Sequence, residues 1–140
     1  MVYIHILLTT DGSELAQRGV DHGLRLAKEL GSKVTALTVT RPYPLRSATT
    51  ADAWEAGQKE HADEVLAPIR KVAFKMGVQA HVVHAKNESA AEAIVETAQK
   101  LGCDLIVMAS HGRRGVTRLL LGSQTAEVVQ SSAIPVLVVR

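Results

Sequence analysis

The chain has 140 residues, 46% of them hydrophobic and 21% charged, and a formal net charge of +2. That length corresponds to about one domain, so we expect a single domain over residues 1–140. The low charge and the scarcity of aromatic residues (3%) disfavour a nucleic-acid-binding protein, which must neutralise many phosphates or stack bases. Cys103 is the only cysteine, which excludes an internal disulfide and a thiolate-rich zinc site.

The sequence also lacks the marks of export or membrane insertion. No apolar run approaches the ~18–20 residues that span a bilayer. Residues 1–8 have neither a basic start nor a small-residue cleavage site, so they do not resemble a signal peptide. We therefore expect a cytoplasmic protein without a membrane partner.

Short apolar runs alternate with helix-like segments along the chain. With few aromatic residues, Val, Ile, Leu and Ala must build the core, and short runs of these residues are typical of buried parallel strands. Three helix-like segments end alike, with a lysine followed by Gly31, Gly77 or Gly102, each suited to the left-handed position after a helix. This alternation predicts an α/β fold with a parallel sheet. The five expected strands are residues 4–8, 34–39, 78–83, 105–109 and 136–139.

The helix starts are marked unequally. Ser13 is expected to cap the first helix, and Ser89 with Glu92 has the spacing of a capping box at the start of the third. The second helix is less clearly marked, because the prolines and hydroxyl residues of residues 41–52 predict a long loop. Pro68 predicts either a kink in that helix or the start of its second half.

Two loops that follow expected strands carry residues suited to ligand binding. Residues 9–13 read Thr-Thr-Asp-Gly-Ser, and residues 110–123 contain three glycines and three arginines. Glycines let a backbone approach a ligand, arginines bind anions, and a helix N-terminus offers free N–H groups. Because open α/β sheets bind ligands beyond the carboxyl ends of their strands, the two loops outline a phosphate or nucleotide site. The P-loop and dinucleotide motifs are absent, however, and an ordinary solvated loop can have the same composition.

The residues around these loops resemble the universal stress protein family. Residues 6–13 (ILLTTDGS) are similar to the family's opening signature. Its closing signature resembles residues 108–112 (MASHG) followed by a nine-residue spacer, Gly122-Ser123 and residues 134–139 (IPVLVV). The resemblance covers the whole chain. It implies a three-layer α/β sandwich with a five-stranded parallel sheet in the order 3-2-1-4-5 and helices on both faces. The first and fourth strands are neighbours in that order, so the two loops meet.

The resemblance further implies an adenine-nucleotide site. The family's ATP-binding branch has the pattern G-x2-G-x9-G-[ST], in which Ala109 replaces the first glycine here and thereby puts ATP binding in doubt. By resemblance, Asp11 holds the ribose or the adenine edge, Thr10 and Val39 border the adenine, and Met108 lines the same pocket. The glycine-rich loop surrounds the phosphates, which a Mg²⁺ or Mn²⁺ ion bridges. The candidate binding residues are Thr9, Thr10, Asp11, Val39, Met108, Ala109, His111, Gly112, Arg113, Gly122, Ser123 and Gln124.

Several candidates also have a purely structural interpretation. Asp11 before Gly12 can simply form a turn, and packing alone can explain Val39 and Met108 at strand ends. Ser123 is expected to cap its helix whatever else it does. His111 is expected to be a hydrogen-bonding loop residue rather than a catalyst.

Other reactive residue types are expected to have no role in catalysis or metal binding. His81 and His84 point to opposite faces of a strand and cannot share a metal ion. Cys103 is expected to be an inert buried thiol. No nucleophile with an adjacent base is apparent near the expected phosphates, so any ATP hydrolysis is expected to be slow and incidental.

These observations favour an adenine-nucleotide-binding stress-response module that acts as a regulatory homodimer. The last strand, residues 136–139, would lie at a sheet edge, and by resemblance it pairs with its copy across a two-fold axis. The alternative, which belongs to the family's other branch, is a dimeric protein-interaction scaffold that binds no nucleotide.

Overall fold

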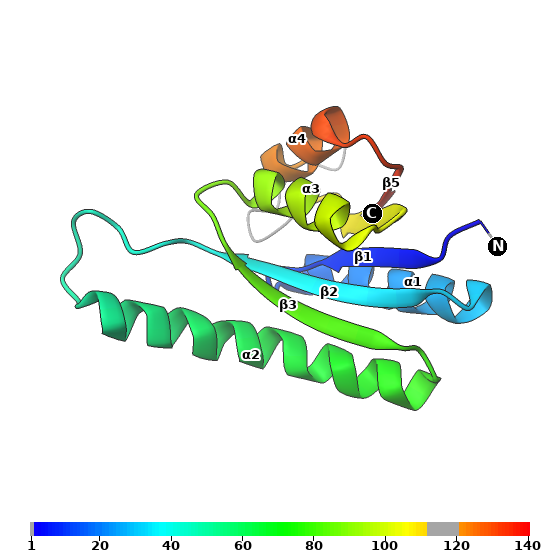
Figure 1. The fold of residues 1–140 in the computed structure, drawn as a ribbon, viewed down its shortest axis with the longest axis horizontal. Helices are drawn as coiled ribbons and strands as arrows, with labels where there is room; N and C mark the ends of the chain where they lie inside the picture. The colour runs from blue at the N-terminus through cyan, green and yellow to red at the C-terminus, as the bar shows by residue number, and fades with distance from the viewer. Residues whose placement is uncertain (1, 112–120) are drawn as a thin grey trace.

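The structure, a computed structural model, describes residues 2–111 and 121–140, which form a five-stranded parallel sheet with helices on both faces (Figure 1). The strand order is 3-2-1-4-5 and every neighbouring pair is parallel, which confirms the predicted topology. The strands are β1 (His5–Thr9), β2 (Lys33–Thr40), β3 (Ala80–Lys86), β4 (Leu105–Ala109) and β5 (Val136–Val139), and the helices are α1 (Glu14–Leu30), α2 (Ala51–Met76), α3 (Ala90–Leu101) and α4 (Ser123–Ser131).

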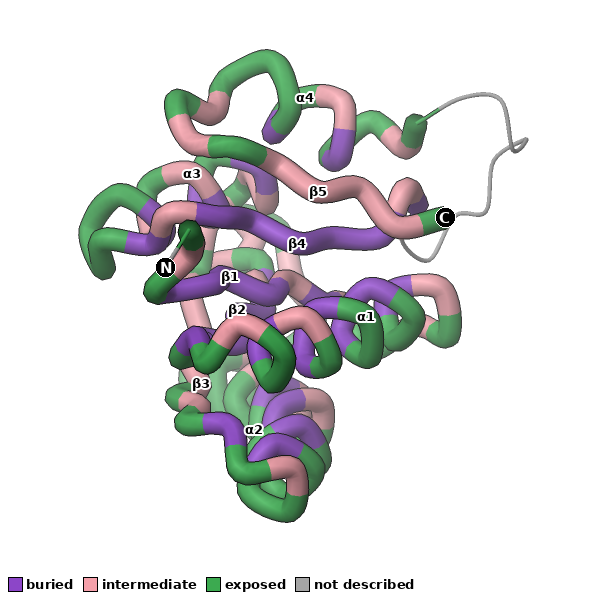
Figure 2. The backbone as a smooth tube through the Cα atoms, turned by 90° about the vertical axis from the view of Figure 1, so that its right-hand side faces the viewer, coloured by how far each residue is buried: buried purple, intermediate pink, exposed green. Residues whose placement is uncertain are grey.

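Two apolar layers hold the sheet between its helices. Successive side chains of a strand point to opposite faces, so Ile6 and Leu8 pack with α1 and α2 while Leu7 packs with α3 and α4. In Figure 2 the central strands β1 and β4 are buried, whereas β5 at the edge is only partly covered. This arrangement is the three-layer sandwich that the resemblance implies.

The predicted helix boundaries are largely confirmed. Gly31, Gly77 and Gly102 each follow a helix with φ between 70° and 77°, a conformation that only glycine adopts readily. The Ser13 side chain accepts a hydrogen bond from the Ala16 amide and so caps α1. The Ser89 side chain caps the N-terminus of α3 in the same way, by accepting a hydrogen bond from the Glu92 amide.

The second helix is longer than the sequence predicts. Thr50 caps it by accepting a hydrogen bond from the Ala53 amide, so α2 begins inside the expected loop and runs through Pro68 without a break. Pro68 therefore does not begin a second half. The buried residues of α2, from Ala62 to Ala73, lie against β2 and β3, and this packing holds the helix together across the proline.

The third strand starts later than expected, at Ala80 instead of residue 78. Its pairing with β2 runs to Thr40 opposite Lys86, so the polar residues that follow the apolar run also belong to the strand. Val82 packs toward α2 and Val83 toward α3. This alternation places His81 and His84 on opposite faces, as predicted.

No helix within residues 2–111 and 121–140 combines the length and apolarity needed to cross a membrane.

Candidate functional site

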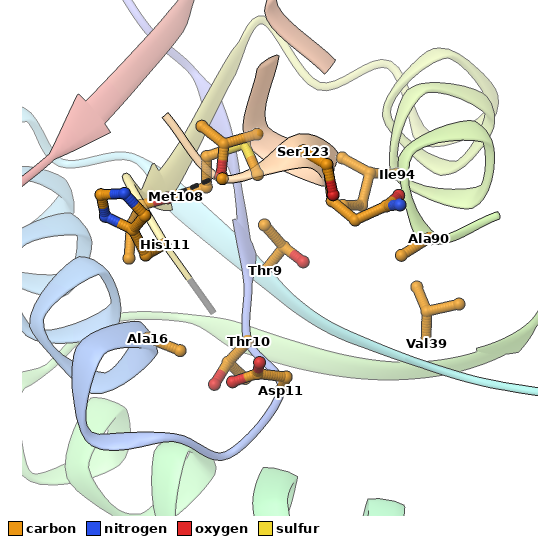
Figure 3. A pocket seen from close by; sticks show the side chains of 14 residues that line it. Thr9, Thr10, Asp11, Ala16, Val39, Ala90, Ile94, Met108, His111 and Ser123 are labelled. Atoms are coloured by element: carbon orange, nitrogen blue, oxygen red, sulfur yellow. Dashed lines mark hydrogen bonds between the residues drawn. The ribbon is translucent and has the colours of Figure 1, made fainter. Parts of the chain in front are cut away.

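A cavity of about 400 Å³ opens at the carboxyl ends of β1, β2 and β4 (Figure 3). Thr9, Thr10 and Asp11 border it from the end of β1, and Met108 and His111 from the end of β4. In an open parallel sheet this is the position where the strand order reverses and ligands bind. All the predicted site residues that the structure describes line this one cavity, namely Thr9, Thr10, Asp11, Val39, Met108, Ala109, His111, Gly122, Ser123 and Gln124.

The loop after β1 is held by hydrogen bonds within itself and to β2. The Thr10 amide donates to the Leu37 carbonyl over 3.0 Å, and the Thr10 carbonyl accepts from the Thr38 hydroxyl over 2.7 Å. Gly12 has φ of 84°, which makes the sharp turn possible. Asp11 Oδ1 accepts from the Ser13 amide at 2.9 Å. Asp11 therefore forms the turn that the structural interpretation predicts, and it also lines the cavity.

One side of the cavity is apolar. Val39 at the end of β2 and Met108 at the end of β4 both belong to the layer packed beneath α3. Ala90 and Ile94 on the first turns of α3 complete this wall. In Figure 3, Val39 and Ala90 lie on the side of the cavity opposite His111.

The other side is formed by the start of α4. The Gly122 amide donates to the Ser110 carbonyl over 2.8 Å, and the Thr125 hydroxyl donates to the Ala109 carbonyl over 3.0 Å. These two bonds fix the helix start against the end of β4. A side chain at Gly122 would bring a Cβ within 3.3 Å of the Ser110 carbonyl oxygen, so this close approach favours glycine.

Ser123 does not cap α4, contrary to the sequence prediction. Gly122 occupies the cap position, and Ser123 is the first helical residue. Within the described part of the chain no side chain caps this helix, whereas side chains of Ser13, Thr50 and Ser89 cap the other three. The first turn of α4, whose residues line the cavity, therefore lacks the usual side-chain acceptor for its amide groups.

Gln124 has a structural role that the sequence does not predict. Its Oε1 accepts a hydrogen bond from the Ala91 amide at 2.8 Å, which joins the start of α4 to the start of α3. Its side-chain oxygen is thus engaged within the protein.

His111 is 7% exposed and sits at the edge of the cavity. Its Nδ1 lies 3.0 Å from the hydroxyl of Ser110, and its Nε2 is buried with no hydrogen-bond partner among residues 2–111 and 121–140. Ala109, the residue in place of the family glycine, is also buried, and its amide nitrogen lies against Gly19 of α1.

Two predicted site residues, Gly112 and Arg113, fall outside the described residues, as do Arg114 and Arg118. The structure adds four cavity-lining residues that the sequence analysis did not single out. They are Ala16, Ala90, Ile94 and Thr125. Ala16 and Thr125 lie in the first turns of the helices that follow the two candidate loops, whereas nothing in the sequence brings the start of α3, with Ala90 and Ile94, to this site. Among residues 2–111 and 121–140 no group of three or more His, Cys, Asp or Glu side chains could hold a metal ion.

Comparison of the sequence with models of known protein families identifies the family. The model described as "Universal stress protein family" matches residues 3–140, nearly the whole chain. The chain belongs to the universal stress protein family.

Individual universal stress proteins match over comparable lengths. Universal stress protein MJ0531 of Methanocaldococcus jannaschii is 35% identical, over 99% of this chain and 83% of the relative. Universal stress protein YxiE of Bacillus subtilis is 30% identical, over 96% of this chain and 97% of the relative.

Solved structures agree with the fold. The structure of hypothetical protein MJ0577 superimposes with a TM-score of 0.87 at 29% identity, over 99% of this chain and 96% of that one. A universal stress protein in complex with cAMP gives a TM-score of 0.73 at 24% identity, covering 100% of this chain and 98% of that one. The universal stress protein from Archaeoglobus fulgidus in complex with dAMP gives 0.70 at 20% identity, with full coverage of both.

Proposed function

We propose that this universal stress protein binds an adenine nucleotide in the cavity between the ends of β1 and β4 and acts as a regulatory homodimer in the cytoplasm. The observation that carries the proposal is the division of one cavity into an apolar side and a side formed by an uncapped helix start. The first suits a planar base and the second an anionic phosphate. The cAMP and dAMP complexes of two proteins of the same fold support an adenine nucleotide as the ligand class.

The lining residues suggest how the nucleotide would lie. The adenine would fit between the apolar side chains of Val39 and Met108, because the described lining residues include no Phe, Tyr or Trp on which it could stack. Asp11 would bind the ribose hydroxyls or the edge of the base, and the phosphates would reach the amides that follow Gly122. Asp11 is the only carboxylate among the described lining residues, so a Mg²⁺ or Mn²⁺ ion entering with ATP would be held mainly by the phosphates.

A scaffold that binds no nucleotide is the second candidate, and Ala109 is the observation that favours it. Ala109 is 8% exposed and stands where the family's ATP-binding branch has glycine. It also lines the cavity, so its methyl group adds bulk there that a glycine would not.

Thermal unfolding with Mg-ATP separates the two candidates. Saturating ligand at about 100 times its Kd stabilises a protein by ~2.7 kcal/mol, so the nucleotide-binding function predicts a Tm higher by several degrees. Ala109→Gly should increase this shift if the methyl group weakens binding. An unchanged Tm at millimolar Mg-ATP in both proteins would instead support the scaffold.

The proposed dimer rests on β5. This strand is the edge of the sheet, its residues are all partly exposed, and Val129 on the neighbouring helix α4 is 44% exposed. An apolar edge strand of this kind pairs readily with another strand. Sedimentation velocity at micromolar concentration should therefore show twice the mass of the chain, and a monomer would refute the dimer.

A further inference from the structure

The outer face of α2 is uncovered in the part of the chain that the structure describes. The buried side of the helix, from Ala62 to Ala73, lies against β2 and β3. On the opposite side runs a row of residues spaced alternately by four and three positions, and every one of them is exposed. Residues spaced in this way form one line along a helix, along which a second helix can pack. The row consists of Ala53, Gly57, Glu60, Glu64, Ala67, Lys71 and Phe74.

The row has a protruding ring near one end and a hollow toward the other. Phe74 is the only phenylalanine of the chain, and it is 85% exposed instead of lying in the core. Gly57 leaves open space on the same face, because a Cβ placed on it would meet no atom within 4 Å. Between Ala56 and Ala67 the surface forms a shallow depression. A large apolar side chain and a place that could receive one therefore lie on the same face of one helix.

Charge divides the helix into the same two halves. Residues 51–64 contain five acidic residues and one lysine, whereas residues 65–76 contain three basic residues and no acidic one. Glu60 and Lys71 of the row form no ion pair within residues 2–111 and 121–140. Two copies of such a helix attract each other only when they are antiparallel, because each acidic half then lies beside the basic half of the other copy. The outer face of α2 is thus complementary to itself.

One antiparallel register satisfies both features. When Phe74 of one copy lies against Gly57 of a second copy, Glu60 comes to lie opposite the second copy's Lys71. Two-fold symmetry makes each of these contacts occur twice. The two Glu64 side chains approach each other at the symmetry axis, and their repulsion limits the strength of the pairing. A single pair of helices also buries less than the ~1,200 Å² at which stable interfaces begin, so the association is weak and reversible.

We propose that α2 is a self-association surface, through which two copies of this chain pair as antiparallel helices with Phe74 against Gly57 and Glu60 against Lys71. The inference goes beyond nucleotide binding and does not depend on it. In both Figure 1 and Figure 2, α2 lies at the end of the molecule away from α4 and β5, beside the opposite edge strand β3. A dimer formed through β5 would keep both of its α2 faces free, and pairing through them would join such dimers into larger assemblies.

Charge reversal at two positions tests the register. In Glu60→Lys and in Lys71→Glu, each contact between residues 60 and 71 would join like charges, so neither protein should pair with itself. An equimolar mixture of the two places opposite charges at both contacts again. Glu96→Lys and Lys100→Glu, at exposed positions of α3, are matched controls with the same changes in net charge. Phe74→Ala removes the ring without changing the charge.

Sedimentation equilibrium at low salt, from micromolar to millimolar concentration, measures the pairing. The parent chain should gain mass above its micromolar species, with a Kd on the order of 0.1 mM, and added salt should reduce this gain. Glu60→Lys, Lys71→Glu and Phe74→Ala should each weaken the association roughly 10-fold or more. The mixture of Glu60→Lys with Lys71→Glu should associate as the parent chain does, and so should the α3 controls.

The remaining outcomes overturn the inference. A parent chain whose mass does not rise at millimolar concentration does not pair through α2. A mixture that stays as dissociated as its two components refutes the contact between residues 60 and 71, and equal weakening in the α3 controls shows a general effect of charge.

These results are distinguishable from failure of the proposed function. A monomer as the micromolar species would refute the dimer through β5, and an unchanged Tm with Mg-ATP would count against nucleotide binding. Neither result alters the mass that is gained through α2.

Discussion

The same substitution, glycine to alanine, should have opposite effects at two helical positions of this protein. Gly57 lies in α2, and a Cβ placed on it would meet no atom within 4 Å. Gly57→Ala should therefore gain only the helix propensity of alanine, about 0.5–1 kcal/mol of unfolding free energy. Gly19 lies in α1, where a Cβ would come within 2.9 Å of the Ala109 amide nitrogen and 3.2 Å of the Met108 carbonyl carbon.

The neighbours of Gly19 decide the sign of its effect. Both atoms belong to the backbone of β4, so the new methyl group cannot be accommodated by turning a side chain, and helix and strand must separate. Overpacking of this kind costs roughly 2–3 kcal/mol, which outweighs the ~1 kcal/mol gained in propensity. We expect Gly19→Ala to lower the unfolding free energy by about 1–2 kcal/mol.

Urea denaturation of the two variants and the parent chain measures this difference directly. The midpoint of Gly57→Ala should rise and that of Gly19→Ala should fall, with unchanged slopes. If both variants were stabilised by similar amounts, α1 would not lie as close to β4 as the structure places it.

Two further predictions concern titratable side chains. Burial raises the pKa of the Cys103 thiol to about 11, so at pH 8 the intact protein should react with a thiol reagent far more slowly than the urea-unfolded chain, and equal rates would contradict this burial. Burial lowers the pKa of His5 and of His84 below 6.5, so below that pH the unfolded state binds more protons than the folded state. The free energy of unfolding should therefore fall as the pH drops below 6.5 and should not change through these histidines above it. Urea midpoints at pH 7.5 and 5.5 should therefore differ less in the double variant His5→Gln, His84→Gln than in the parent chain; an identical difference would rule out both histidines as the cause.

Much of the fold could be predicted because its signals are local and repeated. Helix ends at Gly31, Gly77 and Gly102 follow from residues three or four positions apart, and the apolar runs of buried strands need no knowledge of their neighbours. The strand order, by contrast, came from the family resemblance, since nothing in the alternation of elements distinguishes one order of a parallel sheet from another.

The predictions that were wrong depended on distant contacts. Pro68 does not begin a second half of α2, because the helix packs along β2 and β3 and continues through it, which local propensity does not reveal. Ser123 follows the cap of α4 instead of forming it, because the Gly122 amide is drawn to the Ser110 carbonyl. At the site, the bond between Gln124 and the start of α3 joins residues 33 positions apart.

A crystal structure of the protein grown with AMP tests the central claim most directly. The account predicts the adenine between Val39 and Met108 and the phosphate at the amides that follow Gly122. An empty cavity at millimolar AMP, or a nucleotide bound elsewhere on the molecule, would contradict it.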